Sequence, residues 1–337
     1  MPERGQVASV DGNRYGLNGA MSAKEKRRIR DAVPVAGLLV LCLLWSLESL
    51  RTEFAPGASD GPLPPFAREA LRLALLTVVA ALLSLLRKAE WPRGRQIWDC
   101  VLIGLGLFVV PTLLGDLTQT TIPELARVAL FSLAPVFAVA FEPYLGRLTE
   151  LQSRGGLLAA LGCVIGTVAV FPLAIPRTFE AAGGFFAVIL SVACVAAANC
   201  WAVRLVAKSP RGTAAPIAAM AGGMAALGLG IASVLSERNV GGHPALQSEL
   251  TWAAAVELPA LLLLFWLMRR MSAVRMTTRF IVAPLMVNVV GLILLRPSID
   301  LRVGLGLLLT AISAGWLLCA REEDIETGEF PLKLNQS

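Results

Sequence analysis

The chain has 337 residues, of which 56% are hydrophobic and 16% are charged, and its mean hydropathy is +0.68. This balance excludes an ordinary soluble domain, in which about a quarter of the residues are charged. The formal net charge of +6 leaves two interpretations, a nucleic-acid surface or the basic loops of a membrane protein. The distribution of the apolar residues decides between them.

Ten apolar stretches follow one another along the chain, each close to the 20 or so residues that a helix needs to cross a bilayer. They are rich in Leu and Ala and do not alternate in the way of outer-membrane strands, so the predicted fold class is an all-α membrane protein with ten transmembrane helices. The predicted spans are 33–53, 66–86, 97–115, 123–143, 155–173, 183–204, 213–235, 250–268, 278–295 and 302–319.

The polar ends and loops predict the orientation. Residues 1–32 form a basic tail that we expect to be disordered, with Met21 as an alternative start, and residues 320–337 form an acidic tail. With the N-terminus inside, the cytoplasmic segments carry 22 of the 30 Lys and Arg residues. This bias predicts an N-in, C-in topology and explains the positive charge without a nucleic-acid partner.

Two proline pairs predict an internal repeat. Pro111 and Pro135 lie 24 residues apart in spans three and four, and Pro259 and Pro284 lie 25 apart in spans eight and nine. The segments 33–173 and 183–319 each hold five spans, and because five is odd the second copy enters the bilayer from the opposite side. The sequence therefore predicts an inverted repeat, the architecture of many secondary transporters. The four prolines are candidate hinges, because a proline inside a helix kinks it.

Several chemistries find no support in the sequence. There is no GxxxxGK[ST] phosphate loop, no HExxH motif, no His pair and no CxxC pair, and the six cysteines lie in spans or at cytoplasmic ends. We therefore expect no cofactor, no metal site and no enzyme activity. The Gly162 and Gly166 pair in span five fits either packing within the bundle or a homodimer contact.

Some of these residues carry a resemblance to a known family. Leu43-Leu44-Trp45-Ser46 in span one, Pro65 seven residues before Arg72-Leu73, and the Ala-Pro strings of spans four and nine resemble EamA-type members of the drug/metabolite transporter superfamily. The resemblance implies two inverted five-helix repeats around a central cavity. The Gly-Glu pair that often follows the Pro in that family is absent here, where the corresponding positions read Gly146-Arg147 and Arg296-Pro297. The resemblance therefore implies fold and broad function, but no substrate.

Charged side chains at membrane depth are the candidate site residues, because each costs about 3 kcal/mol on insertion scales and so needs a partner or a use. These residues are Glu48, Arg72, Arg127 and Glu257, with Arg51 as a weaker fifth. Glu48 lies among apolar residues, where desolvation disfavours its charged form, so it can bind a proton or a cationic solute. It can equally pair with Arg51 or Arg72 as a structural group.

The other candidates also have two interpretations each. Arg72 and Arg127 suit a carboxylate or phosphate of a solute, or a structural pair. Glu257, two residues before Pro259, is a solute or proton site, or a salt-bridged acid in a kinked helix. Asn199 and Asn288 bind a solute or connect helices.

The predicted function is a secondary active transporter of the inner (plasma) membrane, moving a small organic metabolite or drug-like solute outward by alternating access against protons. There are two alternatives. One is an anion exchanger or uniporter centred on an arginine, and the other is a lipid head-group flippase. The expected partners are the lipid bilayer, the solute and a coupling proton.

Overall fold

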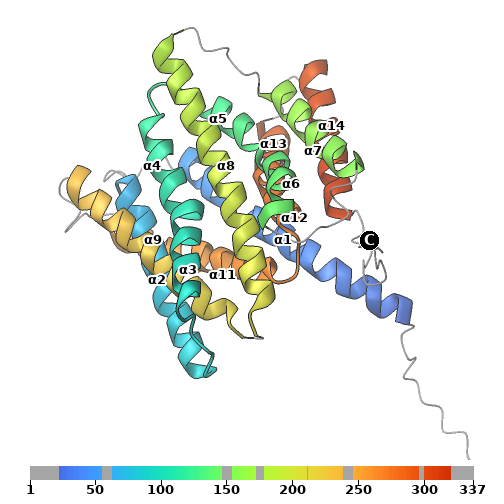
Figure 1. Cartoon of the computed structure of the whole chain (residues 1–337). Coiled ribbons are helices and arrows are strands. Elements are labelled where there is room, and N and C mark those ends of the chain that lie inside the picture. Colours follow the sequence, from blue (N-terminus) through green and yellow to red (C-terminus); the bar gives the residue numbers. More distant parts are fainter. Residues whose placement is uncertain are drawn as a thin grey trace, which may run out of the picture.

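A computed structural model describes residues 23–54, 63–145, 154–171, 178–210, 212–237, 246–295 and 300–319. All regular structure in these residues is helical, so the expected all-α class is confirmed for them (Figure 1). The expected acidic tail and most of the basic tail lie outside the described residues. The described part of the basic tail is helical, because α1 already begins at Ala23.

Helices occupy every one of the predicted apolar stretches. The first half of the chain contains α1 (Ala23–Phe54), α2 (Pro65–Leu86), α3 (Arg95–Gly104), η1 (Leu105–Val109), α4 (Val110–Leu117), α5 (Glu124–Phe131), α6 (Ala134–Leu145) and α7 (Arg154–Val170). The second half contains α8 (Phe179–Lys208), α9 (Ala214–Ser236), α10 (Leu246–Trp252), η3 (Ala253–Glu257), α11 (Leu258–Met268), α12 (Ala273–Thr277), α13 (Arg279–Leu295) and α14 (Leu301–Cys319).

The described chain has the properties of a multi-pass membrane protein. Eight of its helices, some of them joined from shorter pieces, are long and apolar enough to cross a bilayer, and two further apolar helices, Ala32–Glu48 and Gly156–Val170, are shorter. Large apolar side chains such as Val78, Leu82 and Ile231 are exposed on the helix faces. In water such surfaces would be unfavourable, whereas lipid tails solvate them.

Two short π-helical segments, η1 and η3, interrupt long helices at matching places. Each ends two residues before a proline, Pro111 in one case and Pro259 in the other. A proline has no N–H to donate, and its ring clashes with the carbonyl four residues earlier. The residue before each proline instead donates to the carbonyl five residues back, from Val110 to Leu105 and from Leu258 to Ala253. An extra residue in the turn thus accommodates the proline without ending the helix.

The other two candidate hinge prolines lie near breaks rather than π turns. Residues 132 and 133 separate α5 from α6, whose second residue is Pro135, and Thr278 separates α12 from α13, which contains Pro284. Backbone bonds of the tighter i→i+3 type mark both breaks, with Leu133 donating to Leu130 and Thr278 donating to Arg275. The helix is therefore interrupted two residues before Pro135 and six residues before Pro284.

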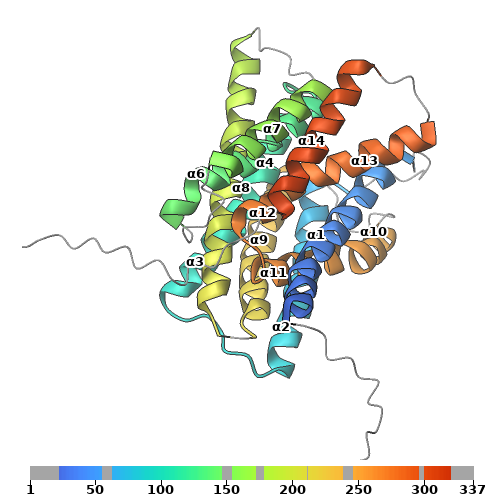
Figure 2. The ribbon, with the colours of Figure 1, turned by 90° about the vertical axis from the view of Figure 1, so that its right-hand side faces the viewer.

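Helices from distant parts of the sequence pack side by side. In both views α2 lies against α9 and α7 lies against α14 (Figures 1 and 2). Two further pairs, α1 with α13 and α6 with α8, join the halves of the chain. The α7–α14 contact uses glycines, because a Cβ added at Gly166 would lie 2.8 Å from the amide nitrogen of Thr310 and 2.9 Å from the carbonyl oxygen of Gly306. The Gly162 and Gly166 face is thus occupied within the bundle.

Candidate functional site

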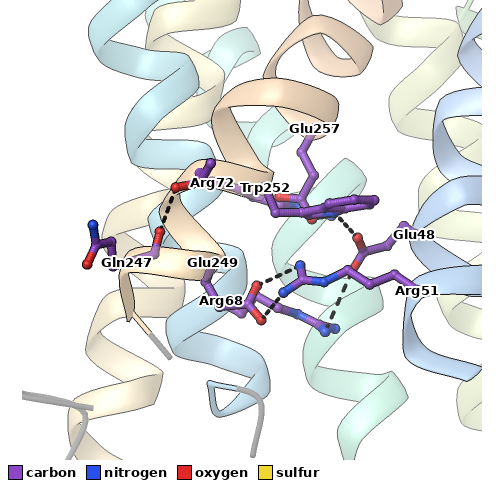
Figure 3. Close-up of polar contacts among 9 residues, drawn as sticks. Glu48, Arg51, Arg68, Arg72, Gln247, Glu249, Trp252 and Glu257 are labelled. Carbon is purple, nitrogen blue, oxygen red and sulfur yellow. Dashed lines mark hydrogen bonds and ion pairs between the residues drawn. The ribbon is translucent and has the colours of Figure 1, made fainter. Parts of the chain in front are cut away.

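A cluster of charged side chains lies where the C-terminal part of α1 meets the N-terminal part of α2 and the α10–η3 segment (Figure 3). Its members on α1, on α2 and on α10 lie three or four residues apart on their own helices, which places them on one face of each. They are Glu48 and Arg51 on α1, Arg68, Glu69 and Arg72 on α2, and Glu249, Trp252 and Glu257 on α10 and η3. The predicted residues Glu48, Arg72 and Glu257 are therefore brought together.

Arg51 and Glu249 form the tightest pair between helices. Arg51 donates two hydrogen bonds, from Nη2 to Glu249 Oε1 at 2.8 Å and from Nη1 to Glu249 Oε2 at 3.2 Å. Its guanidinium also lies over the Trp252 ring, 4.8 Å from the centroid. This two-bond geometry is the strongest that a guanidinium and a carboxylate can adopt, so it ties α1 firmly to α10.

Glu48 is also paired across helices. The indole N–H of Trp252 donates to Glu48 Oε2, and Arg68 Nη1 lies 3.7 Å from Glu48 Oε1. The side chain of Glu48 thus joins α1 to both α10 and α2. Of the two interpretations drawn from the sequence, the structural partners exist, but they are Trp252 and Arg68 rather than Arg51 or Arg72.

Arg72 is shared between two acids. Its Nη2 lies 2.5 Å from Glu69 Oε2 on the same helix, whereas its Nη1 lies 4.0 Å from Glu257 Oε1. Glu257 is 5% exposed. Within the cluster four carboxylates face three guanidiniums, and Glu257 is the carboxylate that has only a distant, shared partner.

The π turn decides where the Glu257 side chain points. In a regular α-helix a residue five positions after Trp252 would point about 140° away from it. The i→i+5 turn of η3 returns the chain to the same face after five residues. In the view of Figure 3 the Trp252 ring lies between Glu257 and the Arg51–Glu249 pair.

The N-terminus of α2 is held by a carboxylate from α9. Glu237, which follows the last residue of α9, accepts hydrogen bonds from the amides of Phe66 and Ala67 at 2.8 and 3.0 Å. A negative charge at this end of a helix also interacts favourably with its dipole. This cap fixes the register of α2 and with it the positions of Arg68 and Arg72.

The other predicted site residues lie elsewhere. Arg127 donates to the carbonyl of Gly115 at 3.2 Å and so connects α5 with α4. Asn288 donates to the carbonyl of Pro284 on its own helix at 2.9 Å. Asn199 accepts a hydrogen bond from Arg279 at 2.9 Å. None of these three contacts includes a residue of the charged cluster.

Several residues of the site were not predicted. Arg68 lies four residues before Arg72, and this helical spacing is the signal that could have identified it. Glu249 and Trp252 lie eight and five residues before Glu257, so only the π turn of η3 brings them to the face of Glu257. Arg279 lies at the start of the predicted span 278–295 but was not singled out as a site residue, yet it is the first residue of α13 and is 2% exposed. Its place five residues before Pro284 is the sequence signal that was overlooked.

No group of three or more metal-binding side chains occurs among the described residues. The acids of the cluster are neutralised mainly by arginines, which is the pattern of an ion-pair network rather than a cation cage. The arrangement can hold a proton on a carboxylate, or exchange one ion-pair partner for another.

The sequence matches no protein-family profile and no curated protein. Solved structures do match the fold. One, described only as a crystal structure of protein, aligns with a TM-score of 0.66 at 18% sequence identity, covering 85% of this chain and 98% of that chain. Similarity at this level of identity is evidence of fold alone, and the coverage means that nearly all of a solved chain has this helical arrangement.

Proposed function

We propose that this protein is a proton-coupled secondary transporter of the inner (plasma) membrane, which exports a small organic solute by alternating access. In this proposal it has ten spans in two inverted five-helix repeats with both ends in the cytoplasm, as in the EamA-type transporters that its sequence resembles. No ATP-binding loop is present in the sequence, so a gradient or a partner supplies the energy, and the proposal is that a proton gradient does.

Two features support the repeat. The π turns η1 and η3 fall at the same distance before the prolines of spans three and eight. The helix contacts also correspond as a two-fold axis requires, with spans one and six, and spans four and nine, as counterparts. Span four packs on span six (α6 on α8), and span nine packs on span one (α13 on α1). Spans two and seven (α2 and α9) and spans five and ten (α7 and α14) pair with their own counterparts.

The observation that carries the proposal is the excess carboxylate, Glu257, in the charged cluster. When Glu257 is ionised, Arg72 attracts both Glu69 and Glu257 and so ties α2 to η3. When Glu257 binds a proton, this attraction is lost while the Arg72–Glu69 pair remains. A proton thus biases the contact between two helices, which is the differential interaction that a coupled conformational change requires.

Glu257→Gln tests this proposal, because glutamine mimics the protonated acid. An Arg72–Glu257 attraction of about 1.4 kcal/mol would shift a two-state equilibrium about tenfold. We therefore expect the rate of export to fall about tenfold and to lose its dependence on external pH. The measurement is metabolite profiling of spent medium and cytosol from cells that express the wild type, Glu257→Gln, Glu48→Gln or an empty vector, at several pH values.

Glu180→Gln is the matched control, since Glu180 is exposed at the start of α8. A solute exported equally by the wild type and Glu257→Gln, with the same pH dependence, would exclude Glu257 as the proton carrier. If the wild type and the empty vector give the same profiles across nutrients and pH values, the export proposal is wrong.

A further inference from the structure

A buried arginine lies outside the charged cluster, at the break between α12 and α13. Arg279 follows the turn at Thr278 and is 2% exposed. Its guanidinium lies 5.3 Å from the ring centroid of Trp45 on α1 and 4.6 Å from that of Phe280. Four helices, α1, α8, α12 and α13, supply the surroundings of this one cation.

The partners of Arg279 are neutral. Its Nη1 donates to Asn199 Oδ1 at 2.9 Å and to the carbonyl of Met276 at 3.2 Å. Its Nε is buried and has no hydrogen-bond partner. No carboxylate of the described residues lies within 4.0 Å of the guanidinium, whereas each arginine of the charged cluster has one.

A guanidinium in this position lacks its counter-ion. Aromatic faces and amide oxygens stabilise a cation, but a buried charge without an opposite charge remains costly, both in a protein interior and at membrane depth. A guanidinium presents paired N–H groups that match a carboxylate. The unpartnered Nε is a donor that such a ligand would satisfy.

We propose that Arg279 binds the carboxylate of the transported solute, so that the substrate class is small organic molecules with one negatively charged carboxylate. A single guanidinium balances one negative charge, which favours a carboxylate over the dianion of a phosphate monoester. The inference rests on the proposed transport function, whose site it deepens. Since Trp45 and Phe280 lie over the guanidinium, the solute reaches it when α1 or α13 moves, as alternating access requires.

The position of Trp45 links this site to the charged cluster. Trp45 and Glu48 are three residues apart on α1, and such residues lie on one face with their Cβ atoms about 5–6 Å apart. The same face of α1 therefore contacts Arg279 at one turn and the cluster at the next. A movement of α1 that uncovers Arg279 also shifts Glu48 relative to Arg68.

The test is thermal unfolding of the purified full-length protein in detergent, because a ligand that binds the folded state raises Tm. The probes are lactate, pyruvate, benzoate and a set of amino acids, each compared with its neutral amide, together with inorganic phosphate and chloride at equal ionic strength. We expect at least one carboxylate, but not its amide, to raise the Tm of the wild type. Arg279→Gln should weaken that binding about 10- to 100-fold, the loss expected for hydrogen bonds to a charged group.

Asn199→Asp is the decisive variant, because it places a permanent carboxylate of nearly the same shape beside Arg279. We expect a higher Tm without ligand and loss of the carboxylate effect. Arg270→Gln is the matched control, since Arg270 also lies over a tryptophan ring, that of Trp266 at 4.4 Å, but is exposed. It should leave the carboxylate effect unchanged.

Three results would overturn the inference: no carboxylate stabilises the wild type more than its amide, phosphate or chloride stabilises it equally well, or the effect survives in both Arg279→Gln and Asn199→Asp. These outcomes are independent of the proton proposal. If export depends on Glu257 but carboxylate binding does not depend on Arg279, the transport proposal is supported and only this substrate class is wrong.

Discussion

Arg51 and Glu249 are 198 residues apart in the chain and form a two-bond ion pair. Glu249 is 5% exposed, so its charge depends on this partner. Isolated surface pairs contribute little to stability, but removing one member of a buried pair leaves a desolvated charge behind. The cluster is therefore sensitive to the loss of single members and tolerant of the loss of matched pairs.

We expect Arg51→Gln to lower the free energy of unfolding by about 1–3 kcal/mol, because it leaves the buried Glu249 carboxylate without its hydrogen-bond donors. The double variant Arg51→Gln with Glu249→Gln should recover most of this loss, because no charge is then left unpaired. The coupling energy is measured by denaturant or thermal unfolding, in detergent, of the wild type, the two single variants and the double variant. Additive losses in the double variant would show that the pair is not coupled.

At the scale of helices, proline and glycine positions set the local geometry. Pro111 and Pro259 each follow a π turn, and the second of these turns brings Glu257 to the face that carries Trp252. The corresponding place before Pro111 is Val109, an apolar residue. Both halves of the chain thus contain a π turn before a proline, but only the turn in the second half positions a charged side chain.

The α7–α14 interface depends on the absence of side chains. We expect Gly166→Ala to destabilise the protein by about 1–3 kcal/mol, as overpacking does, because the added methyl would meet the backbone of Thr310 and Gly306. Gly183→Ala is the control, since nothing lies within 4 Å of a Cβ at that glycine. Both are compared by thermal unfolding, with the oligomeric mass measured in parallel.

A Gly166→Ala variant with unchanged Tm but altered oligomeric mass would contradict this prediction. In that case the Gly162 and Gly166 face would be a contact between two copies of the chain rather than within one bundle.

For the molecule as a whole, the distribution of Lys and Arg predicts its orientation. With Cys319 replaced by Ser, we expect Glu180→Cys to react with a membrane-impermeant maleimide on intact cells, and Arg93→Cys to react only after permeabilisation. Both native side chains are exposed, so reagent access does not depend on unfolding. The reversed pattern would place the N-terminus outside, against the positive-inside rule.

Much of the architecture follows from sequence alone. Each predicted apolar stretch is helical over most of the residues that the structure describes, because only a helix satisfies the backbone within one segment in lipid. The π turns directly precede Pro111 and Pro259, because a proline lacks a backbone donor and its ring clashes with the preceding turn. These properties are local, so the order of the residues determines them.

The pairing of the charges was decided by tertiary structure. The sequence singled out Glu48, Arg72 and Glu257 as charges at membrane depth. It could not show that Glu48 contacts Trp252 and Arg68, or that Arg127 donates to the carbonyl of Gly115. Nor could it show that Arg279 is buried against Trp45. Such contacts depend on which helices pack together and at what rotation. Those quantities arise from side-chain packing between segments far apart in the chain, and no local pattern encodes them.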